Sequence, residues 1–128
     1  MHLLAMPIVD VELVSEGGAV PASVSAPDLA DRLGAVFGSA PGRTWVRLRS
    51  LPATAYAENG VPAASATPLP VFVTVRHASP PTGEWLAEEV AALTRAVAEH
   101  MGRPADRVHV AYEPPAAGRQ AFGGRLVT

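Results

Sequence analysis

The sequence predicts a small α/β protein made of duplicated β-α-β units, with a four-stranded mixed sheet that carries two helices on one face. An apolar strand that begins at Pro7 has a counterpart about 63 residues later, which begins at Pro70. The same offset relates three further pairs of turn-forming residues: Pro41 and Pro104, Pro52 and Pro115, and Gly60 and Gly123. A half of this size cannot bury a core alone. Residues 1–128 are therefore predicted to form a single domain of two packed pseudo-repeats, at about 7–60 and 70–124.

The first half is predicted to contain a strand, a short helix and a second strand. Apolar and polar residues alternate over residues 7–14, which is the pattern of a strand with one buried face. Ser25 is suited to cap a helix that has a proline in its first turn, and Gly38 is suited to end it. The apolar stripe of this helix consists of Leu29, Leu33, Val36 and Phe37. Alternation over residues 44–51 predicts the second strand, and an irregular loop follows to Pro68.

The second half repeats this order, with a strand over residues 70–76, a helix over 83–101 and a strand over 108–112. Gly102 and Pro104 end the helix. Its apolar residues recur at steps of three and four: Leu86, Val90, Leu93, Val97 and Met101. A connection through a helix returns the chain in the same direction, so the strands of each unit are expected to be parallel. Both helices then cover one face, and the other face is expected to be apolar and covered by further copies of the chain.

Composition excludes several classes of function. Ten basic residues, all of them Arg, stand against twelve acidic residues, and no basic run suggests a nucleic-acid partner. The absence of cysteine excludes disulfides and thiolate catalysis. His2, His77, His100 and His109 lack the spacing of metal ligands, so neither a metal nor another cofactor is expected. Residues 1–5 are too short for a signal sequence and no apolar run could span a bilayer, so a cytoplasmic protein without a membrane partner is expected.

Three segments, taken in order, resemble the tautomerase superfamily, which includes 4-oxalocrotonate tautomerase, macrophage migration inhibitory factor and malonate semialdehyde decarboxylase. They are the opening Met-Pro-Ile-Val at residues 6–9, the helix-to-strand passage at 102–110, and the tail from 113 to the Phe-Gly-Gly that ends at 124. The resemblance implies a long-chain, duplicated member. Such members form homotrimers and, like the rest of the family, would act without a cofactor on a small-molecule carboxylate substrate.

The resemblance also implies catalytic roles for three residues. In that family an amino-terminal proline, left after methionine removal, moves the proton, and Pro7 holds this place. Burial and nearby cations lower the pKa of such an amine toward neutrality, where a base is most useful. Arg76 and Arg47 would hold the substrate carboxylate and the developing enolate. Surface or inter-subunit ion pairing is the alternative reading for Arg47.

Three more residues are implied as substrate-binding. His109 is the polar partner that the alignment places where macrophage migration inhibitory factor has a tyrosine. Tyr56 and Phe122 are the candidates for the aromatic wall of the pocket, and packing is the alternative for both. The chain has no lysine where that relative has one, so its phenylpyruvate-type activity is not carried over.

Which of two functions is expected depends on whether the residues before Pro7 remain on the chain. If the chain starts at Met6, removal of that methionine leaves a prolyl amine, and keto-enol tautomerisation of a small 2-oxo or enol acid is expected. If residues 1–6 remain, the nitrogen of Pro7 is a tertiary amide without a basic lone pair. The protein is then expected to be a non-catalytic trimer that acts in binding or assembly, in which Pro7 merely opens a strand. Residues 1–6 are accordingly a leader or the product of a mis-assigned start.

Overall fold

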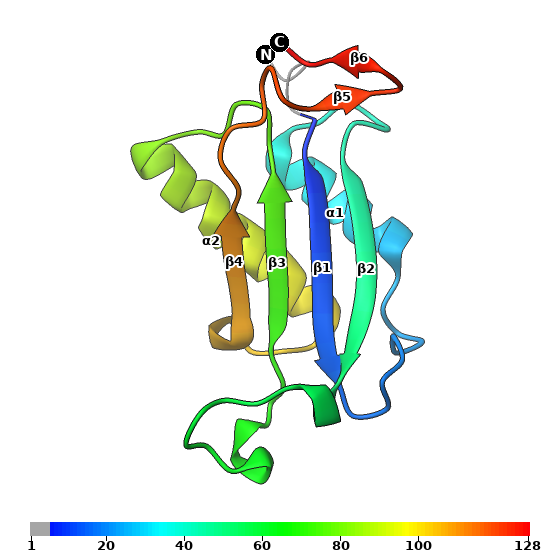
Figure 1. The fold of residues 1–128 in the computed structure, drawn as a ribbon, viewed down its shortest axis with the longest axis vertical. Helices are drawn as coiled ribbons and strands as arrows, with labels where there is room; N and C mark the ends of the chain where they lie inside the picture. Colours follow the sequence, from blue (N-terminus) through cyan, green and yellow to red (C-terminus); the bar gives the residue numbers. More distant parts are fainter. Residues whose placement is uncertain (1–5) are drawn as a thin grey trace.

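The structure, a computed structural model, describes residues 6–128, so the expected leader lies almost wholly outside it. One sheet has the order β2-β1-β3-β4 (Figure 1). Its strands are β1 Ile8–Ser15, β2 Trp45–Pro52, β3 Val71–Arg76 and β4 Val108–Tyr112. β1 and β2 are parallel, as are β3 and β4, whereas the central pair β1 and β3 is antiparallel. The predicted four-stranded mixed sheet is confirmed.

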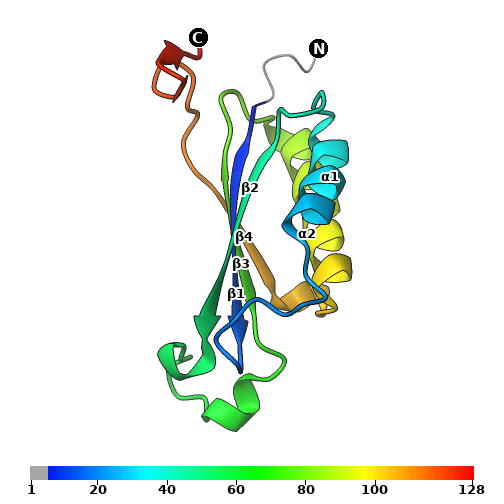
Figure 2. The same cartoon turned by 90° about the vertical axis from the view of Figure 1, so that its right-hand side faces the viewer.

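Both helices lie on the same face of the sheet, as predicted (Figure 2). Helix α1 spans Ala26–Phe37 and α2 spans Gly83–Met101. The hydroxyl of Ser25 caps α1 by accepting a hydrogen bond from the backbone N–H of Asp28, at 3.2 Å. Gly38 and Gly102 end the helices with φ of +67° and +65°, a conformation that costs glycine little.

The core lies between the sheet and the helices. Alternate residues of the two central strands point toward the helices, and the apolar helix stripes meet them. Burial of each such side chain stabilises the fold by roughly 1.5–3 kcal/mol relative to exposure. The fully buried residues of the core include Val9, Val11, Leu13, Val71, Val73, Val75, Leu29, Leu33, Leu93 and Val97.

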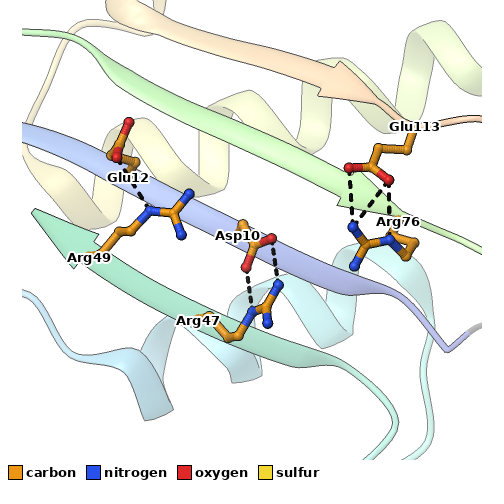
Figure 3. Close-up of polar contacts among 6 residues, drawn as sticks. All are labelled: Asp10, Glu12, Arg47, Arg49, Arg76 and Glu113. Atoms are coloured by element: carbon orange, nitrogen blue, oxygen red, sulfur yellow. Dashed lines mark hydrogen bonds and ion pairs between the residues drawn. The ribbon is translucent and has the colours of Figure 1, made fainter. Parts of the chain in front are cut away.

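The face opposite the helices is not the apolar surface that was expected. It carries three ion pairs, Asp10 with Arg47, Glu12 with Arg49, and, at the end of the sheet where β1 begins, Arg76 with Glu113 (Figure 3). The expectation was wrong because the valines and leucines of these strands point mainly toward the helices. Alternation leaves charged residues at the outward positions. Apolar burial of this face therefore gives no argument for a covering partner.

The connections contain short elements that periodicity did not predict. The loop between β2 and β3 holds two 3-10 helices, Ala53–Ala55 and Ala63–Ala66, and a third, Ala105–Arg107, precedes β4. After β4, strands β5 (Ala121–Phe122) and β6 (Arg125–Leu126) form a hairpin near the start of β1 (Figure 1). Within the described residues, no helix is long and apolar enough to cross a membrane.

Candidate active site

Pro7 immediately precedes β1, at the end of the sheet where that strand begins. Its side chain is fully buried, and its carbonyl accepts a hydrogen bond from the backbone N–H of Trp45, at 3.0 Å. The neighbouring Ile8 pairs with both Trp45 and Arg76. Pro7 is thus held between the start of β2 and the end of β3. A free amine at this position would lose hydration, and desolvation lowers the pKa of an amine.

The tail of the chain forms the surroundings of the residue before Pro7. Nε2 of Gln120 donates a hydrogen bond to the carbonyl oxygen of Met6, at 3.3 Å. The ring of Phe122 stacks on Trp45 with 4.5 Å between centroids. A cavity of about 390 Å³ opens here, and its lining comprises Met6, Arg43, Phe122, Arg125, Leu126, Val127 and Thr128. The sequence signal for the aromatic wall was the Phe-Gly-Gly tail, whereas nothing in the pattern singled out Gln120.

Arg76 is close to Pro7 in the sheet but already has a partner. Its Nε and Nη2 donate to the two carboxylate oxygens of Glu113, at 3.1 and 3.2 Å (Figure 3). Both side chains are partly exposed. A small cavity of about 180 Å³ lies beside the pair, with Arg119 also in its lining. Glu113 was missed as a site residue because its proximity to Arg76 depends on the register of β3 with β4.

Arg47 lies on the same open face, on the edge strand β2. Its guanidinium forms a two-point contact with the carboxylate of Asp10, with 2.8 Å between Nη2 and Oδ2 (Figure 3). This hydrogen bond holds the pKa of Asp10 below its ordinary value, and the charges of Arg49 and Arg76 act in the same direction. The side chain of Arg47 is mostly exposed. Within one chain, Arg47 is therefore an ion-pairing residue.

Tyr56 and His109 lie toward the opposite end of the sheet. The ring of Phe72 stands between them, 6.1 Å from Tyr56 and 5.5 Å from His109. The hydroxyl of Tyr56 donates to Glu58, which Arg107 also contacts, at 2.7 Å. Burial, followed by the hydrogen bond to Glu58, raises the pKa of Tyr56.

The expected site residues therefore fall into separate groups within one chain. Phe72 pairs with Glu12, so at about 3.3 Å per residue it lies about 17 Å along the sheet from Pro7. Pro7 has Arg76 and Phe122 near it, whereas Tyr56 and His109 lie near Phe72. Arg47 stands between the two groups on the open face.

One buried titratable residue near Pro7 was not among the expected site residues. His77 follows β3, and the register of β3 with β1, continued by one residue, places it opposite Pro7. It is 6 % exposed, and burial lowers the pKa of its imidazole. Its Nδ1 accepts a hydrogen bond from the backbone N–H of Ser79, at 3.0 Å. The lowered pKa favours the uncharged form of His77. Among residues 6–128, no cluster of His, Cys, Asp and Glu side chains could hold a metal ion.

Comparison with known proteins identifies the fold. No protein-family model matches the chain, and no curated protein is significantly similar to it. Solved structures do match over nearly its whole length. A fused 4-OT, a wild-type symmetric trimer, has a TM-score of 0.74 at 20 % identity over 94 % of each chain. Macrophage migration inhibitory factor from Toxoplasma gondii has a TM-score of 0.67 at 18 % identity, over 93 % of this chain and 98 % of that one.

A third match is a malonate semialdehyde decarboxylase inhibited by 3-bromopropiolate. Its TM-score is 0.68 at 19 % identity, over 91 % of this chain and 88 % of that one. The class is thus a duplicated β-α-β protein with a mixed four-stranded sheet. More particularly, the chain has the fold of the fused 4-OT structures, two of which match it with TM-scores of 0.74 and 0.67.

Proposed function

We propose that this protein is a cofactor-independent tautomerase that transfers a proton within a small 2-oxo or enol carboxylic acid, with Pro7 as its amine. The buried position of Pro7 at the start of β1, in a tautomerase fold, is the observation that carries this proposal. Two of the matching structures contain proteins treated with small acids. One was inactivated by 2-oxo-3-pentynoate and the other inhibited by 3-bromopropiolate, which supports a small carboxylate as substrate.

The chemistry requires a base and a cation. The neutral amine of Pro7 would take a proton from the carbon next to the keto group. The electron pair of that C–H bond would form the C=C bond of the enolate, and the π pair of the C=O bond would move to the keto oxygen. The resulting enolate would be stabilised by a guanidinium, and the prolyl ammonium would return the proton to give the isomer. Arg76 is the nearest of the proposed guanidinium groups along the sheet, since its neighbour in the register is Ile8.

We propose further that the protein works as a homotrimer with sites between subunits. Tyr56 and His109 lie too far from Pro7 to act on the same small molecule within one chain. A second copy could bring its own Tyr56 and His109 to Pro7, and Arg47 on the edge strand β2 is placed to reach a neighbour. The trimeric state of the matching fused 4-OT supports this arrangement.

The test compares two forms of the protein that differ only before Pro7. Expression from Met6 should give a free prolyl amine after methionine removal, and this form should ketonise simple enol acids. A form that keeps residues 1–6, verified by intact mass, should be inactive because its Pro7 nitrogen is an amide. The form that begins at residue 7 is called the short form. The substitution Pro7→Ala in the short form is the control, since it exchanges the secondary amine for a primary one.

Two outcomes would contradict the proposal. Equal activity of both forms, with the leader intact by mass, would remove Pro7 from the reaction. Inactivity of both forms across a panel of 2-oxo and enol acids would support the alternative, a non-catalytic trimer. The contact of Gln120 with the Met6 carbonyl is the observation that favours this alternative, because it shows that the acylated Pro7 is accommodated in the fold.

A further inference from the structure

The side chain of Gln120 is buried next to the acyl group of Pro7 and is only half satisfied. Gln120 is 7 % exposed, and its Nε2 donates to the carbonyl oxygen of Met6. Its Oε1 is buried and has no hydrogen-bond partner among residues 6–128. Buried polar side-chain atoms are nearly always paired, so an unpaired carbonyl oxygen here needs an explanation.

Methionine removal would change the hydrogen-bonding groups at this point. The Met6 carbonyl is the acyl part of the Pro7 amide, so its loss takes away the acceptor that Nε2 of Gln120 uses. The same cleavage converts the Pro7 nitrogen, which has no hydrogen, into an amine that carries one hydrogen when neutral and two when protonated. The new donor arises next to the carbonyl group that Gln120 contacts, and Oε1 of Gln120 has no partner among residues 6–128. The processed chain thus offers Oε1 the donor that it lacks in the acylated chain, while Nε2 loses its acceptor.

The backbone around Gln120 is fixed well enough to position an amine. Its carbonyl accepts a hydrogen bond from the N–H of Val127 at 2.7 Å, which ties it to the strand that follows the hairpin turn. The N–H of Arg119 donates to Ala116 at 2.8 Å. The stack of Phe122 on Trp45 attaches the hairpin to β2. Rigid support of this kind is what a positioning side chain requires.

We propose that Gln120 is a positioning residue for the free amine of Pro7, with Oε1 accepting a hydrogen bond from the Pro7 N–H once Met6 is removed. This inference rests on the proposed function, in which Pro7 is the reacting amine. A hydrogen bond through the N–H fixes the direction of the lone pair of the neutral amine. The substrate proton is transferred to that lone pair, so the direction of the lone pair affects the rate of transfer.

The hydrogen bond also has a predictable effect on the titration of Pro7. An acceptor binds an ammonium more strongly than a neutral amine, so Gln120 stabilises the protonated form. The arginines around the position act against it, namely Arg43 in the loop before β2, Arg125 on β6 and Arg76 at the end of β3. Glu113 offsets part of the charge of Arg76, and the buried His77, whose lowered pKa favours the uncharged imidazole, adds no charge. Removal of the Gln120 acceptor should therefore lower the pKa of Pro7.

The experiment follows the isotope-labelled nitrogen of Pro7 by NMR across a pH titration of the form that begins at Pro7. Gln120→Leu should lower the pKa of this amine by about half a pH unit to one pH unit, which is about a three- to tenfold change in its acid constant. Gln120→Glu keeps an acceptor and adds a negative charge, so it should raise that pKa. If Gln120→Leu fails to fold, the Gln120→Glu titration decides alone, and an unchanged pKa there would overturn the proposal.

Turnover provides a second readout, which separates this inference from the proposed function. On an enol acid that the short form converts, Gln120→Leu should lower kcat by about tenfold or more while KM changes little, because substrate contacts are kept. Activity with unchanged kcat and unchanged Pro7 pKa in Gln120→Leu would overturn the role of Gln120 and leave the tautomerase intact. A shifted pKa in a protein that converts no acid would support the role of Gln120 and overturn the tautomerase.

Discussion

Arg76 offers a substrate only part of its guanidinium as long as Glu113 is bound to it. The carboxylate of Glu113 occupies Nε and Nη2, which leaves Nη1 as the group to which a second anion could bind. The pair is partly exposed, so its own contribution to stability is small, about 0–1 kcal/mol. A substrate carboxylate could displace Glu113 at little cost to the fold.

The first residue-scale prediction concerns this arginine. Arg76→Ala should raise KM for a carboxylate substrate and cost on the order of 2–4 kcal/mol in kcat/KM, if Arg76 contacts the developing charge. The matched control is Glu113→Gln, which keeps the shape of the partner but removes its charge. This control should lower KM, because Arg76 is released for the substrate. Steady-state kinetics of the short form measure both, and unchanged kcat/KM in Arg76→Ala would return Arg76 to a surface ion pair.

At the scale of the elements, local contacts at the helix ends determine where the helices begin and end. Ser25 supplies a side-chain acceptor for an otherwise unpaired N–H at the start of α1. Its backbone N–H donates to Nε2 of His100 at 3.0 Å, so the start of α1 also contacts the end of α2. The contact of Ser25 with Asp28 depends on the Ser25 side chain, whereas its contact with His100 depends only on the backbone.

The prediction for this element uses that distinction. Ser25→Ala removes the capping hydroxyl and should lower the free energy of unfolding by about 1 kcal/mol, while the backbone contact to His100 remains. Ser23→Ala, an exposed serine two residues earlier, is the control and should change stability by less than about 0.5 kcal/mol. Urea unfolding followed by circular dichroism measures both variants. Equal effects of the two substitutions would show that the cap contributes nothing.

Such local signals explain which elements could be predicted from the sequence. Strands β1 to β4 and both helices were predicted within about two residues, because alternation, stripes and caps are properties of neighbouring residues. The β5-β6 hairpin was missed because strands of two residues have no period. Pairing of Arg76 with Glu113, and of Gln120 with Met6, depends on register and tail path. No pattern of neighbouring residues predicts either of these two contacts.

At the scale of the whole molecule, we expect a second copy to bind the open face of the sheet. Phe72 is exposed beside Glu12 toward one end of this face, and Trp45, on which Phe122 stacks, is level with Arg76 at the other end, so aromatic and charged side chains lie next to each other. The edge strands β2 and β4 have unpaired sides, and unpaired strand edges are common points of association. Ion pairing and strand edges, rather than an apolar surface, therefore support the proposed assembly.

The corresponding prediction is a homotrimer in solution. Light scattering should give about three times the chain mass of 13.3 kDa at micromolar concentration. Arg47→Glu, which places like charges at Asp10, should shift the mass toward the monomer. A mass of one chain under all conditions would contradict both the trimer and the shared site.

The antiparallel contact of β1 with β3 relates the two β-α-β units by an approximate twofold axis through the middle of the sheet. Under that pseudosymmetry Pro70 is the image of Pro7, and it too is buried at the head of a strand. Pro70 lies within the chain, so no processing of the amino terminus can make its nitrogen basic. The duplication within one chain therefore leaves one position at which removal of the preceding residues would expose an amine and one at which it cannot. At the second position, Arg103 donates a hydrogen bond to the Pro70 carbonyl at 3.1 Å.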